Sequence, residues 1–194
     1  MPRMVLVLKL LGLSYLAYVL YFLLFEYDPT SPSFSPPFVL WIIDIINLFI
    51  HEAGHFFLKP FGQWIHVFGG SFVQVFLPLL LALLGLRQNY AHAVLPAFWC
   101  GESLVNVSVY IRDAPFRQLR LIAKGLIHDW NWLLSDNLDW AETLADVAFG
   151  TGVLLCAVAI GAGVVGAIQA YRGSAEGETE HVVPARLEGK KAGR

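Results

Sequence analysis

The segment His51-Glu52-Ala53-Gly54-His55 carries residue types at a spacing suited to metal chemistry. It is an HExxH motif, and residues four apart project from nearly the same face of a helix. His51 and His55 can therefore bind one metal ion, while Glu52 beside them handles protons. In water-soluble enzymes this arrangement binds Zn²⁺ and activates a water molecule. The motif predicts a Zn²⁺ cofactor with Glu52 as general base; two histidines that pack without metal are the alternative.

The surroundings of the motif are those of a membrane protein. Of the 194 residues, 57% are hydrophobic and only 14% are charged, which is typical of a chain with several membrane spans. Ionisable residues inside a membrane segment are costly, so a functional role is favoured for them. The formal net charge of −2 gives no sign of nucleic-acid binding. We therefore expect chemistry within a lipid bilayer or at its edge, in a single domain.

The expected fold is an all-α polytopic membrane protein of five to six transmembrane helices. The apolar segments that predict spans cover about residues 4–25, 38–58, 72–86, 91–111 and 143–171. The less hydrophobic residues 115–135 are expected to form an interfacial helix, and a sixth span arises if 119–134 crosses the membrane. Residues 1–171 then form one membrane-embedded domain, and the polar residues 172–194 form a disordered tail.

Residues 59–71 interrupt the apolar pattern directly after the HExxH helix. Pro60 and Gly62 precede Trp64, and the pair Gly69-Gly70 closes the segment. This pattern predicts a short hairpin or re-entrant segment beside the metal-binding helix, because irregular backbone at membrane depth must be buried or line a wet cavity. An extended segment here offers its edge to an unwound substrate strand. An ordinary interfacial loop is the alternative.

Lysine and arginine residues precede the first expected span and follow the second and the fourth. By the positive-inside rule, this distribution puts the N-terminus in the cytoplasm, with the HExxH end of the second span and His128 on the same side. Five spans leave the C-terminal tail outside despite its basic residues, and a sixth span would bring it back. We expect an integral multi-pass protein of the cytoplasmic membrane, in contact with the lipid bilayer.

A catalytic zinc site has three protein ligands and one open position, so HExxH needs a third ligand from elsewhere in the chain. His128 and Asp129 are the best candidates, because they place an imidazole and a carboxylate side by side in an aromatic setting. Either His128 binds the metal with Asp129 supporting it, or Asp129 is the ligand. An interfacial aromatic anchor is the alternative without metal. The histidines less suited to ligation are His66, His92 and His181.

Polar residues inside the expected spans predict a buried polar site. Asp44 and Asn47 share the helical face of the two HExxH histidines, where they can orient ligands or line a water path. Glu102 is a carboxylate within a span and needs a partner or a proton. It fits three roles: support for a ligand, a fourth ligand, or a neutral acid that holds helices together.

Amide side chains are candidates for contacts with substrate. Asn106 or Asn131 can donate a hydrogen bond to the oxyanion of a tetrahedral intermediate. Gln74 and Ser71 follow the glycine pair closely and can touch substrate backbone. For each of these residues, a satisfied polar contact between helices is the alternative.

Together, these residues resemble the site-2-protease class of intramembrane zinc metalloproteases, as a distant and compact relative. The resemblance depends on HExxH within a transmembrane helix, a glycine-containing segment after it and a later aspartate in a hydrophobic setting, and it covers about residues 38–135. The class usually has its aspartate before a glycine, which is absent here. The site residues that the resemblance implies are His51, His55 and Asp129 as Zn²⁺ ligands and Glu52 as base. Its implied substrate is a membrane protein or peptide.

The function that these residues favour is zinc-dependent hydrolysis of a peptide bond in or near the membrane. Glu52 takes a proton from the zinc-activated water and passes it to the leaving amine. A di-iron lipid oxidase is disfavoured, because it needs about eight histidines and the chain has six. The alternative is a non-catalytic metal-binding membrane protein, such as an assembly factor or chaperone, which does not need Glu52.

Overall fold

The computed structural model describes residues 2–119 and 126–191, and all regular secondary structure in these ranges is helical. The elements are α1 (Pro2–Phe25), α2 (Phe38–Leu58), the 3-10 helix η1 (Lys59–Phe61), α3 (Gln63–Gln88), α4 (Tyr90–Arg112), α5 (Asp129–Leu133) and α6 (Trp140–Lys191). The all-α prediction is confirmed. Five helices are long and apolar enough to cross a membrane: α1, α2 with η1, α3, α4 and the first 35 residues of α6.

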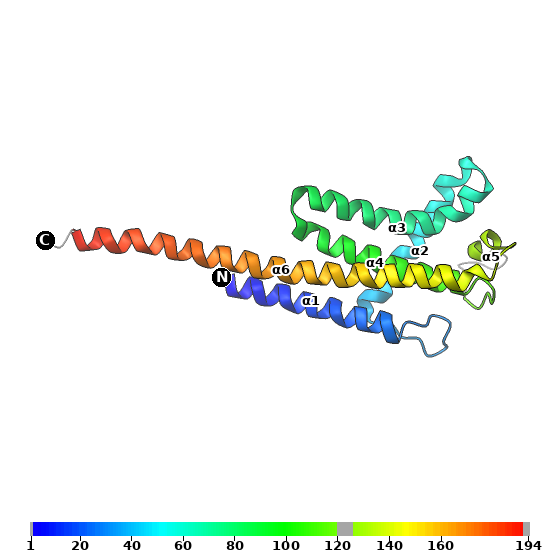
Figure 1. Ribbon diagram of the computed structural model, residues 1–194, viewed down its shortest axis with the longest axis horizontal. Helices are drawn as coiled ribbons and strands as arrows, with labels where there is room; N and C mark the ends of the chain where they lie inside the picture. The colour runs from blue at the N-terminus through cyan, green and yellow to red at the C-terminus, as the bar shows by residue number, and fades with distance from the viewer. Residues whose placement is uncertain (1, 120–125, 192–194) are drawn as a thin grey trace.

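The helices α1, α3, α4 and α6 run lengthwise, each in the direction opposite to the one named before it, and α2 crosses them obliquely (Figure 1). Tyr90 at the start of α4 donates a hydrogen bond to Gln169, and Arg112 at its end donates to Asp146, so α4 and α6 are antiparallel. Gly163 of α6 lies against Leu13 of α1, and Figure 1 shows these two helices running in opposite directions. The start of α1, the α3–α4 turn and the residues near Gln169 therefore share one end of the bundle. The short helix α5 and the start of α6 lie at the other end.

The start of α1 and the HExxH motif lie at opposite ends of the bundle, which differs from the arrangement expected if both face one side of the membrane. The reason is the course of α2, which does not return beside α1. Leu40 near its start packs in the core cluster with Phe98 of α4, and its motif lies beside Tyr110 near the end of α4. Consequently α6 brings residue 172 back to the N-terminal end without a sixth span. Which end faces the cytoplasm stays a prediction.

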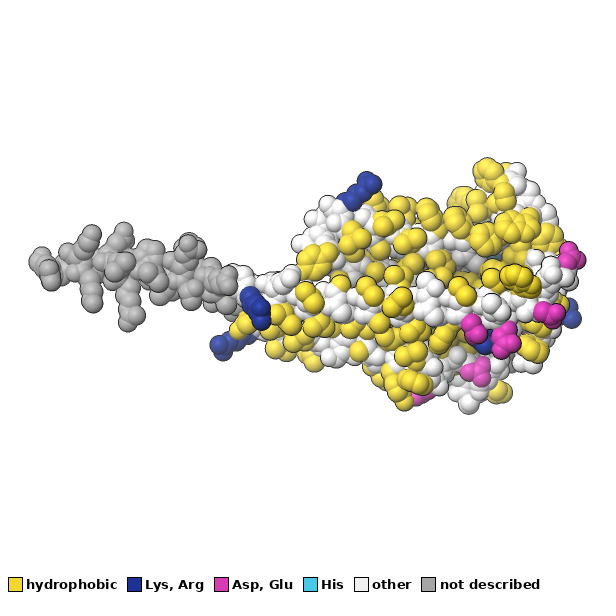
Figure 2. Space-filling view, in the orientation of Figure 1, with side chains coloured by type: hydrophobic (Ala, Val, Ile, Leu, Met, Phe, Trp, Pro, Cys, Tyr) yellow, Lys and Arg dark blue, Asp and Glu magenta, His cyan; other side chains and the backbone are white. Residues whose placement is uncertain are grey.

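The surface of the bundle is apolar along its length. Figure 2 shows hydrophobic side chains spread over the lengthwise helices, with most charged side chains near the two ends. Large side chains such as Leu95, Val147 and Leu154 are each more than 60% exposed. Soluble monomers rarely expose contiguous apolar surface on this scale. The surface therefore matches the apolar composition that predicts a membrane-embedded chain.

The core is built where α1, α4 and α6 meet. Val19, Val105 and Cys156 belong to one buried cluster that joins the three helices. Gly101 of α4 faces Gly152 of α6 so closely that a Cβ at Gly152 would lie 2.5 Å from the Gly101 carbonyl oxygen. Small residues at such crossings allow backbones to approach in apolar surroundings. This packing fixes α4, which carries part of the polar site on its other face.

The segment after the HExxH helix is helical, so the predicted hairpin is wrong. Lys59–Phe61 form η1, Gly62 turns the chain with a φ of 99°, and α3 then continues without a break from Gln63 to Gln88. Gly69 serves helix packing instead of a turn, because its backbone touches that of Gly54 in α2. Re-entry into the membrane by this segment stays a prediction.

Two further expectations differ from the structure in part. Within residues 115–135, where an interfacial helix is expected, the described helix is only the five-residue α5. Residues 120–125, which fall inside the proposed sixth span, lie outside the described residues. At the C-terminus, α6 continues to Lys191 through the residues expected to form a disordered tail. The division into a membrane domain and a tail stays a prediction.

Candidate metal centre

Three metal-ligating side chains meet where α2 and α5 approach each other. His51 and His55 come from α2, Asp129 begins α5, and one donor atom from each lies within 4.8 Å of the others. The Asp129 Oδ2 atom is 2.9 Å from His51 Nε2 and 3.1 Å from His55 Nε2. Ligand atoms on a tetrahedral Zn²⁺ are roughly 3.3 Å apart, given metal–ligand distances near 2.0–2.1 Å. The group therefore has the spacing needed to hold a metal ion.

Both imidazoles direct their Nε2 atoms toward Asp129 Oδ2 and use their Nδ1 atoms for other contacts. His51 Nδ1 lies 3.1 Å from the side-chain oxygen of Gln74, and His55 Nδ1 lies 2.8 Å from the backbone oxygen of His66. Amide oxygens only accept hydrogen bonds, so each Nδ1 must carry the hydrogen. Metal-binding histidines commonly use their other ring nitrogen in this way, which fixes the ring and its tautomer.

Gly70 of α3 makes room for the two imidazoles. A Cβ at this position would lie 2.5 Å from His51 Nε2 and 2.6 Å from His55 Nε2. The glycine pair thus has separate roles in α3: Gly69 permits contact with Gly54 of α2, and Gly70 clears the space beside the ligating atoms. A side chain of any size at residue 70 would occupy the position from which a metal is bound.

Asp129 is positioned by hydrogen bonds around the first turn of α5. Its backbone N–H donates to the Tyr110 hydroxyl at 3.1 Å, and the Trp130 indole N–H donates to Ser71 of α3 at 3.0 Å. Burial raises the pKa of the Asp129 carboxyl, but hydrogen bonds from His51 and His55 outweigh it and lower the pKa to about 2. Asp129 is therefore an ionised carboxylate at neutral pH, as a metal ligand must be.

His128 lies next to Asp129 in sequence but turns away from the metal group, which consists of His51, His55 and Asp129. Its Nδ1 accepts the backbone N–H of Asn131 at 3.2 Å and so caps α5, and its Nε2 donates to Asp113 at 3.2 Å. Burial lowers the pKa of His128, while the bond to Asp113 opposes this shift. Of the two candidates for the third ligand, the structure brings Asp129 to the HExxH histidines and uses His128 to hold the loop before α5.

Glu52 faces the same cavity as the three donors. This cavity has a volume of about 590 Å³, and His51, His55 and Asp129 also line it. Its apolar walls come from α2, α3, α4 and the segment before α5: Leu48, Val67, Val109, Leu126 and Ile127. Glu52 is half-buried, so a carboxylate lies beside the metal group within reach of solvent.

The four other candidate residues have different environments. Gln74 and Asn106 line the cavity and bond each other, with the Gln74 amide donating to Asn106 at 2.8 Å. Asn131 donates to the Ala114 carbonyl at 2.8 Å and helps fix α5. Glu102 is fully buried and accepts a hydrogen bond from Asn47 at 2.8 Å, whereas its Oε1 has no partner among the described residues. Asn131 and Glu102 do not line the cavity.

Sequence reasoning missed three residues that build the site. Gly70 was assigned to a turn, because a glycine pair is also the usual signal for one. Tyr110 contacts His51 with its ring and Asp129 with its hydroxyl; its four-residue spacing from Asn106 was its one signal. Asp113, which accepts hydrogen bonds from Gln118, Leu119 and His128, gave no signal at all.

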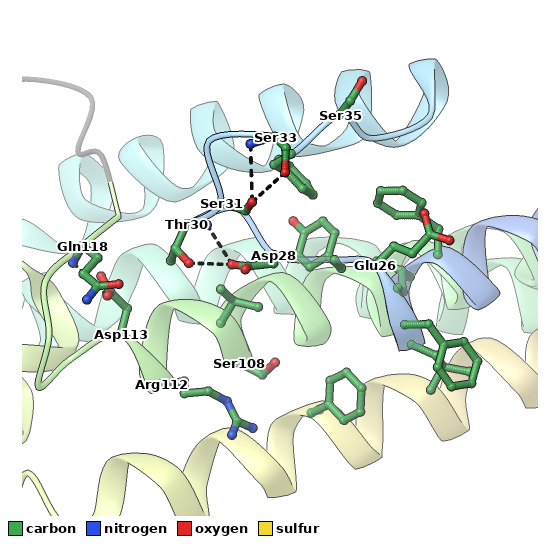
Figure 3. A pocket seen from close by; sticks show the side chains of 18 of the residues that line it. Glu26, Asp28, Thr30, Ser31, Ser33, Ser35, Ser108, Arg112, Asp113 and Gln118 are labelled. Atoms are coloured by element: carbon green, nitrogen blue, oxygen red, sulfur yellow. Dashed lines mark hydrogen bonds between the residues drawn. The ribbon is translucent and has the colours of Figure 1, made fainter.

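A second cavity has a volume of about 910 Å³. It lies between the α1–α2 connection, the last turns of α4 and the first turns of α6, and Tyr27 is among its lining residues. Figure 3 shows Asp28, Thr30 and Ser31 on the connection and Arg112 on α4, with the Arg112 side chain directed toward α6. Arg112 pairs with Asp146 at 2.6 Å. Both polar and apolar side chains line this cavity. The one group of three residues that could hold a metal among the described residues belongs to the first cavity.

The first cavity combines two imidazoles, a carboxylate and a glutamate, which can bind a metal and move a proton in one place. Two histidines with one acidic residue are a ligand set of catalytic zinc sites. Comparisons with protein-family models, with curated proteins and with solved structures found no match for this chain. The function proposed for it therefore depends on the chemistry of this site.

Proposed function

We propose that the protein is a membrane-embedded, zinc-dependent peptidase that hydrolyses a peptide bond in or near the membrane. The observation that carries the proposal is the buried group of His51, His55 and Asp129, with Glu52 in the same cavity, on helices apolar enough to cross a membrane. The same four residues support the resemblance to the site-2-protease class. Its partners would be the lipid bilayer and a membrane protein or peptide as substrate.

His51, His55 and Asp129 would hold the Zn²⁺, and the chemistry that Zn²⁺ supplies is acidification of a water molecule and polarisation of the scissile carbonyl. Glu52 accepts the proton of the attacking water and then donates it to the leaving amine. Gln74 and the His66 carbonyl accept hydrogen bonds from the two Nδ1 atoms, so that each imidazole would present its Nε2 atom to the metal.

The cavity also supports a peptide as substrate. Its walls are largely apolar, while Gln63 supplies an amide group that can pair with a peptide backbone. A peptide must be unwound to expose its carbonyl, because a helix uses its own N–H and C=O groups internally. A substrate segment that leaves its helix at the edge of the membrane meets these requirements.

The test combines metal content with turnover in detergent-purified protein. We expect about one zinc per chain in the wild type, as for a mononuclear site, and the same content in Glu52→Gln. Turnover of a transmembrane peptide should fall by roughly 10²–10⁴-fold in Glu52→Gln, because the base is lost while the ligands remain.

Two neighbouring substitutions serve as a matched pair. Asp129→Ala should lose the zinc, whereas His128→Ala should keep most of it, because His128 bonds Asp113 and not the metal group. A wild type without zinc would overturn the proposal. Zinc binding with equal hydrolysis in wild type and Glu52→Gln would leave a metal-binding protein, such as an assembly factor or chaperone, instead of this peptidase.

A further inference from the structure

One line of hydrogen bonds leads from the metal ligand His51 to a carboxylate on the same helix. His51 Nδ1 meets the Gln74 side-chain oxygen at 3.1 Å, and the Gln74 amide nitrogen donates to Asn106 Oδ1 at 2.8 Å. The Asn106 amide nitrogen then donates to Asp44 Oδ1 at 3.1 Å. Three helices contribute to this line: α2, α3 and α4.

Every bond in this line points the same way. Each amide accepts with its oxygen and donates with its nitrogen, so His51 donates to Gln74, Gln74 donates to Asn106, and Asn106 donates to Asp44. A carboxylate can only accept, so it fixes the direction of the whole line. Hydrogen bonds in such a series polarise one another, and the negative charge at the end strengthens that effect.

The connection between α1 and α2 closes the line. The Tyr27 hydroxyl donates to Asp44 Oδ1 at 2.7 Å and accepts from the Asn106 amide at 2.8 Å. Asp44 thus receives hydrogen bonds from Tyr27 and Asn106, and both donors hold its carboxylate in one orientation. Tyr27 also lines the second cavity, whereas Asp44 lines the first.

The second ligand is held differently. His55 donates to the backbone oxygen of His66, and His66 Nδ1 donates back to the His55 carbonyl at 2.9 Å. These backbone contacts follow from the close approach of α2 and α3 and involve no charged side chain. The two imidazoles of the motif therefore differ: among the described residues, the side-chain line to a carboxylate begins at His51.

We infer that Asp44 is a positioning residue of the metal centre, which acts on His51 through Asn106 and Gln74. It fixes the tautomer of His51 and increases electron density at the Nε2 atom, as a carboxylate in direct contact with a ligating histidine does. The inference depends on the proposed metal site, because it assigns a role toward the metal and not toward the substrate. It also gives Tyr27 a role, since the tyrosine orients the carboxylate.

The test measures the affinity of the purified protein for Zn²⁺ and Co²⁺ by competition with a chelator. Asp44→Asn keeps an oxygen that can accept both hydrogen bonds but removes the charge, so we expect metal affinity to fall roughly tenfold. Tyr27→Phe should lower affinity about two- to threefold, because it removes one of two groups that orient Asp44. Asp146→Asn makes the same chemical change at an exposed ion pair and should leave affinity unchanged.

A rescue separates this role from a purely structural one. Gln74→Glu places a carboxylate directly against the His51 N–H, so adding it to Asp44→Asn should restore affinity to within about threefold of wild type. The Co²⁺ absorption spectrum should change in Asp44→Asn and recover in the double variant. If Asp44 merely held helices together, Gln74→Glu would not rescue binding.

The outcomes distinguish the two proposals. A wild type that binds neither ion overturns both the metal site and this inference. Normal metal binding by wild type and by folded Asp44→Asn overturns the inference alone and leaves the proposed peptidase intact. Weaker binding that Gln74→Glu does not recover also overturns it, with folding of each variant checked by circular dichroism.

Discussion

Two regions of the molecule use α4 for opposite purposes. On one face, Gly101 and Val105 pack against α6 and α1 in an apolar core. On the other, Asn106 and Tyr110 reach the metal group through hydrogen bonds and a ring contact. The first region has small and aliphatic residues in close contact, and the second has ionisable and amide side chains around a cavity.

The difference shows that one face of α4 contributes mainly to the stability of the fold and the other face mainly to the candidate metal site. In the packing region, close contacts between backbones determine how much protein is folded. Around the candidate metal site, hydrogen bonds hold His51, His55 and Asp129, whose buried polar atoms would be costly without partners. Substitutions should therefore sort into those that lower metal affinity in folded protein and those that lower the folded fraction.

Gly70 is the position where we expect the largest loss of metal affinity without a loss of folded protein. Gly70→Ala puts a methyl group beside both Nε2 atoms, so metal affinity should fall by more than about a hundredfold while most of the fold remains. Chelator competition measures the loss. Gly150→Ala is the control, because a Cβ there meets no atom within 4 Å. Metal binding by Gly70→Ala at wild-type affinity would contradict the assigned site.

The opposite result is expected in the packing region. Gly152→Ala forces a Cβ against the Gly101 carbonyl and should lower the free energy of unfolding by about 1–3 kcal/mol. Metal affinity of the molecules that remain folded should stay as in the wild type. Thermal unfolding followed by circular dichroism checks the first point, with Gly161→Ala as an open-space control. A loss of affinity in folded Gly152→Ala would show that the two regions are coupled.

Asp113 lies between the regions and sharpens the comparison. It ends α4 and accepts two backbone N–H groups and His128, which together shape the loop before Asp129. Asp113→Asn replaces one acceptor by a donor, so we expect about 1–2 kcal/mol of destabilisation and a few-fold loss of metal affinity. Both should appear together in unfolding and chelator titrations. If Asp113→Asn lowers the free energy of unfolding but leaves metal affinity unchanged, Asp113 contributes to folding and not to the candidate metal site.

The smallest effect is expected at the exposed pair of Arg112 and Asp146. Their side chains are 47% and 64% exposed, and solvent-exposed ion pairs contribute roughly 0–1 kcal/mol. Arg112→Gln should therefore change the unfolding free energy by less than about 1 kcal/mol and leave metal affinity unaltered. A larger change in unfolding experiments would mean that the pair closes the second cavity in a way that matters for the fold.

The sequence predicted the parts of this structure that depend on local pattern. Apolar segments indicated the long helices, and the spacing of His51 and His55 placed them on one face. The sequence could not show whether His128 or Asp129 is the third candidate ligand. The two residues are adjacent and have the same sequence surroundings, so only the directions of their side chains distinguish them. That direction follows from the local cap of α5 by His128 and from the contact of His128 with Asp113, fifteen residues earlier in the sequence.

The expectations that differ from the structure concern features that depend on contacts between distant helices. Glycine is favoured both where a chain turns and where two helices touch, so Gly69 and Gly70 fit either structure until the partner helix is known. Counting spans likewise assumes that each apolar segment reverses the chain. The oblique course of α2 breaks that assumption, although its length and hydropathy are those of an ordinary span.

The oblique crossing of α2 separates the three candidate metal ligands from the end of the bundle where α1 begins, so in a membrane these two ends would face different compartments. Arg3 lies in the first turn of α1, Arg87 in the last turn of α3, and Arg172 three residues after Gln169 of α6, which Tyr90 contacts. The start of α1 and the α3–α4 turn are at the end of the bundle away from α5 (Figure 1). If the positive-inside rule holds for this end, the cavity opens in the outer leaflet. A peptide cut there would release its soluble fragment away from the cytoplasm, and the other fragment would stay anchored in the bilayer.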